Sequence, residues 1–274
     1  MSYSVTGFRY RWFVENCGIL ELPNGKVIVI DPIFRKDEQA CQIEPEKGYI
    51  CGFDDSVVTR CDYILLTHVH FDHIGSLKAL QERFHAPILV NGWSAYALIK
   101  HLDLPTGSVI PMTDGCEYNF DDFRVLWQQG RHTPKIGQIR PSDSGTMAPE
   151  LDCDFLFRGT VYNSNFIIKL PSGMSIAMDG GNFEPHLNEL EKYHPTLVLH
   201  HASRTLAQCA SEAEAVLRRS GSPYLLFLTM QIMPDAEGMA AQINQMLEEK
   251  GVNGRVVFAK PGQQVDFCTS AVIG

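Results

Sequence analysis

The sequence has 274 residues, of which 45% are hydrophobic and 20% are charged, and its mean hydropathy is −0.09. A chain of this length buries roughly three quarters of the surface that its unfolded form exposes, and its composition excludes disordered, collagen-like and small disulfide-stabilised proteins. The formal net charge of −9 argues against a long nucleic acid as the main partner, because that partner needs a basic surface, but it leaves room for a small-molecule substrate.

The first part of the chain predicts strands that alternate with helices. Aromatic and basic residues alternate over residues 8–13, which predicts a half-buried edge strand rather than a nucleic-acid contact. A hairpin is predicted over Gly18–Pro32, because Pro23-Asn24-Gly25 is typical of a turn and the second strand must stop at Asp31-Pro32. The next segments predict, in order, a strand over Asp62–Thr67, a helix over Ser76–Phe84, a strand over Pro87–Val90 and a helix over Gly92–His101.

The second part of the chain repeats this order of hairpins followed by strands and helices. The predicted elements are two strands between Cys116 and Trp127, a hairpin over Asn165–Leu170 and Met174–Met178, a strand over Thr196–Leu199, a helix over Ala207–Arg219, a strand over Tyr224–Thr229, a helix over Ala236–Lys250, and strands over Arg255–Ala259 and Gln264–Phe267. Two long polar segments, Arg35–Ser56 and Gly130–Leu151, are predicted to be loops near a functional site. Since no low-complexity linker divides the chain, we expect one α/β domain over residues 1–274, with a two-sheet core and helices outside.

The segment with the clearest chemical signal follows the strand predicted at Asp62–Thr67. His68, His70, Asp72 and His73 form an H-x-H-x-D-H pattern there. His68 and His70 are two residues apart, so an extended backbone directs both to one side, and Asp72 and His73 follow as the chain turns toward a helix. One metal ion could take the first two side chains and a second ion the last two. Burying all four together without a cation or hydrogen bonds would cost several kcal/mol.

The segment Thr67–Gly75 (THVHFDHIG) resembles the signature of the metallo-β-lactamase superfamily. The resemblance implies an αββα four-layer sandwich of two mixed β-sheets with helices outside, and one or two zinc-type ions. It extends to Gly130–Pro134, which implies His132 as a ligand, and to residues 175–181, which implies Asp179 as a ligand between the two metals. A first hairpin that ends in Asp31-Pro32 is similar to the branch that includes L-ascorbate-6-phosphate lactonase.

The last ligand departs from the pattern of that branch. Its members commonly place a final His at a strand end near the C-terminus, whereas residues 228–231 contain none. His201 is the favoured replacement and His200 the second candidate. Neighbours on an extended segment face opposite ways, so we expect only one of them to face the metals.

The resemblance also implies a cofactor and a mechanism. Two divalent ions are expected, zinc first, with manganese, iron or nickel also compatible with nitrogen and carboxylate ligands. Such a site lowers the pKa of bound water toward ~7, and Asp72 would accept a proton as well as bind metal. Iron-containing electron-transfer relatives replace the second His with Glu, so His70 favours hydrolysis over redox chemistry.

The predicted function is a metal-dependent hydrolase of a small ester, lactone or phosphoester. The alternatives are a phosphodiesterase or nuclease, and a non-catalytic ligand-binding or sensor protein with the same fold. Arg131, Lys135 and Arg140 lie closest in sequence to His132; they could hold a phosphate or carboxylate, or equally be solvated. The sequence carries no signature of oligomeric state.

Location and redox state follow from two further patterns. The N-terminal residues lack a signal-peptide pattern, and no run of about 18 apolar residues occurs, so we expect a cytoplasmic protein without a membrane span. The 8 cysteines are scattered without a C-x-x-C pair, which predicts reduced thiols.

Overall fold

The computed structural model describes residues 7–34, 53–130, 162–179, 184–201, 205–228 and 235–268. Within these ranges the strands form two sheets of seven strands each, and each sheet combines parallel and antiparallel pairs. None of the helices described is long and apolar enough to cross a membrane.

The first sheet is built mostly from the N-terminal part of the chain, together with one strand from near the C-terminus. Its order is β14 (Gln264–Phe267), β1 (Phe8–Val14), β2 (Cys17–Glu21), β3 (Val27–Ile30), β4 (Tyr63–Leu65), β5 (Ile88–Asn91) and β6 (Val109–Met112). The helical segments of this part are η1 (Asp55–Val57), α2 (Phe71–Ile74), α3 (Leu77–Phe84), α4 (Gly92–Leu102) and η2 (Thr106–Ser108). The expectation that residues 8–13 form an edge strand is wrong, because β14 pairs with the outer side of β1.

The second sheet follows the same plan. Its order is β13 (Arg255–Val257), β12 (Tyr224–Phe227), β11 (Leu197–His200), β10 (Ser175–Asp179), β9 (Ser164–Lys169), β8 (Phe123–Gln129) and β7 (Glu117–Phe120). The helices of this part are α6 (Glu184–Tyr193), α7 (Leu206–Ser220) and α8 (Ala236–Glu249). β10 to β13 are parallel, and β7 to β10 are joined by antiparallel pairs.

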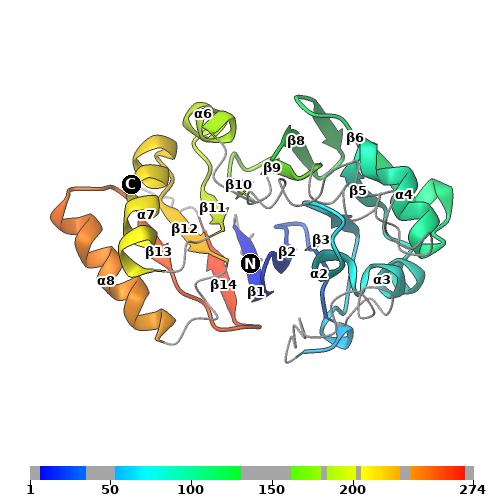
Figure 1. Cartoon of the computed structure of the whole chain (residues 1–274), viewed down its shortest axis with the longest axis horizontal. Coiled ribbons are helices and arrows are strands. Elements are labelled where there is room, and N and C mark those ends of the chain that lie inside the picture. The colour runs from blue at the N-terminus through cyan, green and yellow to red at the C-terminus, as the bar shows by residue number, and fades with distance from the viewer. Residues whose placement is uncertain are drawn as a thin grey trace, which may run out of the picture.

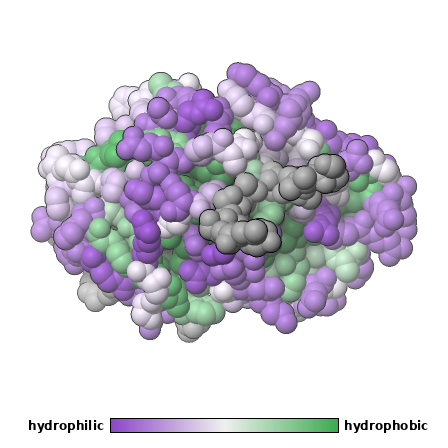
Figure 2. Space-filling view, turned by 180° about the vertical axis from the view of Figure 1, so that it is seen from behind, coloured by the Kyte–Doolittle hydropathy of each residue, from purple (hydrophilic) through white to green (hydrophobic). Residues whose placement is uncertain are grey.

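The layers confirm the predicted αββα sandwich. In Figure 1 the strands occupy the middle, with α3 and α4 on one side and α7 and α8 on the other. Side chains that alternate along a strand separate the cores: Ile176 and Met178 of β10 enter the core between the sheets, whereas Ala177 enters the core under the helices of the second sheet. Hydrophilic residues predominate on the face shown in Figure 2.

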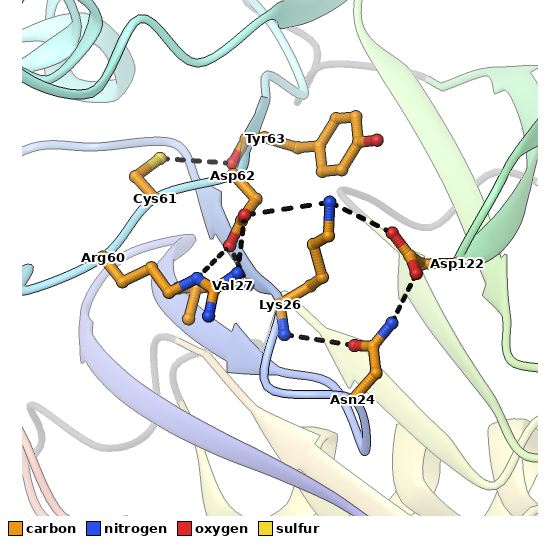
Figure 3. Close-up of polar contacts among 8 residues, drawn as sticks. All are labelled: Asn24, Lys26, Val27, Arg60, Cys61, Asp62, Tyr63 and Asp122. Carbon is orange, nitrogen blue, oxygen red and sulfur yellow. Dashed lines mark hydrogen bonds and ion pairs between the residues drawn. The ribbon is translucent and has the colours of Figure 1, made fainter.

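Polar contacts join the two sheets both where the parallel strands end and where they begin. At the edge where the parallel strands end, the backbone N–H of Ser164 in β9 donates to the carbonyl of Thr67, at 2.7 Å. At the edge where β3 and β4 begin, Lys26 lies between two carboxylates, 3.9 Å from Asp62 and 3.3 Å from Asp122 of the second sheet (Figure 3). Parallel strands bring their carboxyl ends to one edge, so the functional residues that follow them gather there.

The carboxylate of Asp62 in this second group is held in its charged form. Its burial works against ionisation, but the Arg60 guanidinium, the Val27 backbone N–H and Lys26 together lower the pKa of Asp62 below its usual value. Asn24 also donates to Asp122, at 2.6 Å (Figure 3). The group stabilises the contact between the sheets on the side away from the H-x-H-x-D-H segment.

Candidate metal centre

The candidate metal centre lies where β3 and β4 end. Asp31 follows β3 directly and has a positive φ of 42°, a conformation that Asp adopts more readily than most residues. Its backbone N–H donates to the carbonyl of Leu65 at 3.0 Å, which keeps the two chains together beyond the strands. His68 and His70 follow β4, and the short helix α2 then carries Asp72 and His73.

A buried network of hydrogen bonds fixes the carboxylate of Asp31, whose exposed fraction is 0%. Its Oδ1 accepts from the Thr67 backbone N–H at 2.8 Å, and its Oδ2 accepts from the Thr67 hydroxyl at 2.5 Å. Nδ1 of His73 lies 2.8 Å from the same Oδ2. These bonds compensate the cost of burying a carboxylate.

Thr67 in turn positions His68. Its hydroxyl donates its proton to Asp31, so its oxygen accepts from Nδ1 of His68 at 3.0 Å. Asn16, in the turn between β1 and β2, also donates to this oxygen at 3.4 Å. Both Nδ1 atoms, of His68 and of His73, are therefore engaged, and Nε2 is the atom that each ring would offer to a metal.

Three of the predicted ligands lie close together. The ring centroids of His68 and His70 are 4.7 Å apart, and those of His68 and His73 are 3.8 Å apart. His68 and His73 are buried, and one ligand atom from each of them and from Asp31 lies within 4.8 Å of the others. Nitrogen donors with an engaged second ring nitrogen suit a divalent transition metal, so the residues fit such an ion.

Asp31 is the member of this cluster that sequence reasoning missed as a site residue. In the sequence, Asp31-Pro32 predicted the end of a strand and made the hairpin resemble that of one branch of a family. The available signal was a carboxylate placed directly at the end of an apolar strand. Its three hydrogen bonds indicate that it orients His73 and Thr67.

Several other predicted site residues lie wholly or partly outside what the structure describes. Asp72 lies in α2 and Asp179 at the end of β10, beside His200 in the register of the parallel sheet, but their side chains are outside what the structure describes. His132, Arg131, Lys135 and Arg140 lie outside the described residues. Their roles stay predictions.

The two candidates for the last ligand point to different surroundings. His200 is fully buried on the helix side of its sheet, with Nε2 3.9 Å from a carboxylate oxygen of Glu212 in α7. Nε2 of His201 lies 3.7 Å from a carboxylate oxygen of Glu15, the neighbour of Asn16 in the turn that contacts Thr67. This placement favours His201 as the residue on the side of the metal centre.

The strand that leads toward His132 ends close to the same network. The backbone N–H of Gly130 donates to the Asn163 carbonyl at 2.7 Å. A Cβ on Gly130 would lie 2.8 Å from Oδ1 of Asn165 and 3.1 Å from the carbonyl carbon of Ser164. The close approach needs glycine and packs the end of β8 against the segment that bonds Thr67.

Comparisons with known proteins bear on the family and on the fold. Residues 10–108 match the family model described as the metallo-beta-lactamase superfamily. A UPF0173 metal-dependent hydrolase of Cupriavidus taiwanensis is 26% identical over 263 residues, which cover 93% of this chain and 85% of that protein. Among solved structures, a metallo hydrolase from Ignicoccus hospitalis has a TM-score of 0.63 at 16% identity and covers 95% of this chain and 98% of its own. An isothiocyanate hydrolase from Delia radicum gut bacteria has a TM-score of 0.65 at 15% identity, with 95% and 99% covered.

Proposed function

We propose that the chain is a metal-dependent hydrolase of a small ester, lactone or phosphoester, because residues 10–108 match the metallo-beta-lactamase superfamily model and the chain has the fold of a solved metallo hydrolase. The buried cluster of Asp31, His68 and His73 at the carboxyl ends of β3 and β4 carries this proposal. The match to relatives named metal-dependent hydrolases supports it.

The cluster explains how the chain prepares a metal site. A divalent ion such as zinc, once bound, lowers the pKa of a coordinated water toward ~7 and so supplies a nucleophile at neutral pH. Asp31 and Thr67 hold the Nδ1 sides of the two buried rings, which fixes the tautomer and the direction of each ring. Asp72 accepts a proton from the nucleophile in this scheme.

The full ligand set is proposed by position. His68, His70 and His132 form one group, and Asp72, His73 and His201 (or His200) form a second, with Asp179 between them. Two ions, zinc first, would occupy this set. Arg131, Lys135 and Arg140 would hold an anionic part of the substrate.

The test combines metal analysis with hydrolysis assays on the purified full chain. We expect about two equivalents of metal, and turnover of at least one member of a panel of lactones, phosphodiesters and thioesters with added zinc or manganese. His70→Ala and Asp72→Asn should remove the metal-dependent turnover. His85→Asn is the matched control, because His85 is an exposed residue with φ 53° at the end of α3, a conformation that Asn tolerates.

Two results would count against the proposal. Full activity in His70→Ala or Asp72→Asn would contradict the assigned chemistry. A folded protein that takes up no metal would instead favour a ligand-binding protein on the same fold.

A further inference from the structure

Two large aromatic side chains lie exposed on one turn of α4. Trp93 is 66% exposed and Tyr96 is 76% exposed. In the described part of the chain, Met246 on α8 is the one other exposed large hydrophobic residue, at 36%. Residues three apart in a helix are neighbours on its surface, so Trp93 and Tyr96 share one face.

This face begins next to the segment that carries His68. The backbone N–H of Leu66 donates to the Leu89 carbonyl at 3.0 Å, so the chain that leads into Thr67 and His68 still lies beside β5, which ends at Asn91. Oδ1 of Asn91 caps α4 by accepting from the backbone N–H of Trp93 at 2.9 Å. Trp93 therefore follows β5 at the edge where the candidate metal centre lies.

Trp93 also contacts a residue that leads into the second sheet. The rings of Trp93 and Tyr162 stack with centroids 5.8 Å apart and an angle of 16° between their planes. Tyr162 precedes Ser164 by two residues, and Ser164 donates to Thr67 at 2.7 Å. Two residues span about 7 Å at most, so this stack also lies near the metal centre.

We propose that Trp93, Tyr96 and Tyr162 form a substrate subsite that binds an aromatic ring or another flat apolar group of the molecule to be hydrolysed. The inference rests on the proposed function and names the class of substrate for that site. Aromatic faces exposed to water gain most from a ring that stacks on them. Because Trp93 follows β5 at the same end of the sheet as His68 follows β4, a ring stacked there would lie at the end that carries the candidate metal centre.

The charge beside the subsite narrows the class further. Nδ2 of Asn91 donates to Oδ1 of Asp114 at 3.4 Å, so the residue that caps α4 next to Trp93 is bonded to a carboxyl group. A carboxylate there favours a neutral or cationic ring over an anionic one, because like charges repel.

The first test uses the fluorescence of Trp93 in the full chain. The sequence has 3 tryptophans, and Trp12 and Trp127 are fully buried, so iodide quenching reports Trp93. We expect 4-phenylbutyramide to protect this residue from quenching and butyramide to leave the quenching unchanged. Equal quenching with both probes would overturn the subsite. Protection that grows with protein concentration in the absence of a probe would also overturn it, because a second copy would then cover the face.

The second test measures hydrolysis of two methyl esters that differ by a phenyl group. Trp93→Ala and Tyr96→Ala should each raise KM for methyl 4-phenylbutyrate about ten-fold with little change in kcat, and should leave KM for methyl butyrate unchanged. Trp93→Phe should keep most of the affinity because it keeps a ring. Met246→Ala on α8 is the matched control and should change neither ester.

The two tests separate failure of the subsite from failure of the proposed function. If neither ester is hydrolysed while the phenyl probe protects Trp93, the subsite stands and the proposed ester chemistry does not. If both esters are hydrolysed and KM does not respond to Trp93→Ala, the subsite is overturned and the hydrolase stands.

Discussion

Replacing Asp31 by Asn isolates the hydrogen bonds that hold the two buried imidazoles. Oδ1 of Asp31 accepts from the Thr67 backbone, and Oδ2 accepts from the Thr67 hydroxyl and faces Nδ1 of His73. An amide has one oxygen and one NH₂ group. If its NH₂ faces the Thr67 backbone N–H, two fixed donors meet, which costs about 1–3 kcal/mol of folding free energy. If its NH₂ instead faces Nδ1 of His73, that nitrogen must accept, and the His73 proton moves to Nε2, the atom that would bind the metal.

The same change should weaken metal binding. Loss of a partner that orients a metal-binding His typically costs about 10–100-fold in affinity, or about 1.4–2.8 kcal/mol. The assay is competition with a chromogenic chelator, run beside thermal unfolding of the metal-free and metal-loaded protein. Asp114→Asn is the control, because Asp114 is an exposed carboxylate at the same edge and should change neither measurement.

The outcome separates orientation from simple stability. If Asp31→Asn lowers the unfolding temperature but keeps the metal affinity of the original protein, Asp31 supports the fold and does not orient a ligand. If neither quantity changes, the hydrogen-bond reasoning is wrong altogether.

Three further predictions concern residues away from the ligands. Because the pKa of Asp62 is lowered on folding, its stabilising contribution is present above the unfolded pKa of about 4 and is lost as pH falls through the folded pKa; acid unfolding of Asp62→Asn should therefore depend less on pH in that range. Gly130→Ala should lower the free energy of unfolding by about 1–3 kcal/mol through its close contacts, whereas Gly107→Ala, whose Cβ would meet nothing within 4 Å, should change it little in chemical denaturation. Burial raises the pKa of Cys61 to about 12, so iodoacetamide at neutral pH should modify exposed Cys116 and leave Cys61 intact by mass spectrometry; modification of Cys61 in the native protein would show that its burial is wrong.

Local sequence patterns predicted the strands and helices better than they predicted which strands pair in the sheets. The predicted hairpin, the strand before the H-x-H-x-D-H segment and the helices α3, α4, α7 and α8 are confirmed. β6 was missed because Pro111 interrupts its pattern, and it lies at a sheet edge, where proline is tolerated. The pairing of β1 with β14 could not be predicted, since it joins segments from opposite ends of the chain.

The residues of the candidate site also divide into those that local spacing predicted and those that depend on how the strands and sheets pack. His68, His70 and His73 share a short segment, so spacing alone predicted that they meet. The part of Asp31 depends on the register between β3 and β4, and the stack of Trp93 on Tyr162 depends on how the two sheets meet; neither is visible in a local pattern. The cytoplasmic location and the lactonase branch stay predictions. One domain over residues 1–274 is a proposal that the core shared by the two sheets supports.

Thr67 bonds to both sheets through its backbone N–H, its carbonyl and its hydroxyl. The N–H and the hydroxyl act on Asp31 and His68 within the first sheet, and the carbonyl receives Ser164 of the second. Sliding of one sheet over the other would therefore pull on the residue that aims a metal-binding ring. The packing of the two sheets therefore constrains the position of Thr67. Through Thr67 it also constrains the orientation of the His68 ring.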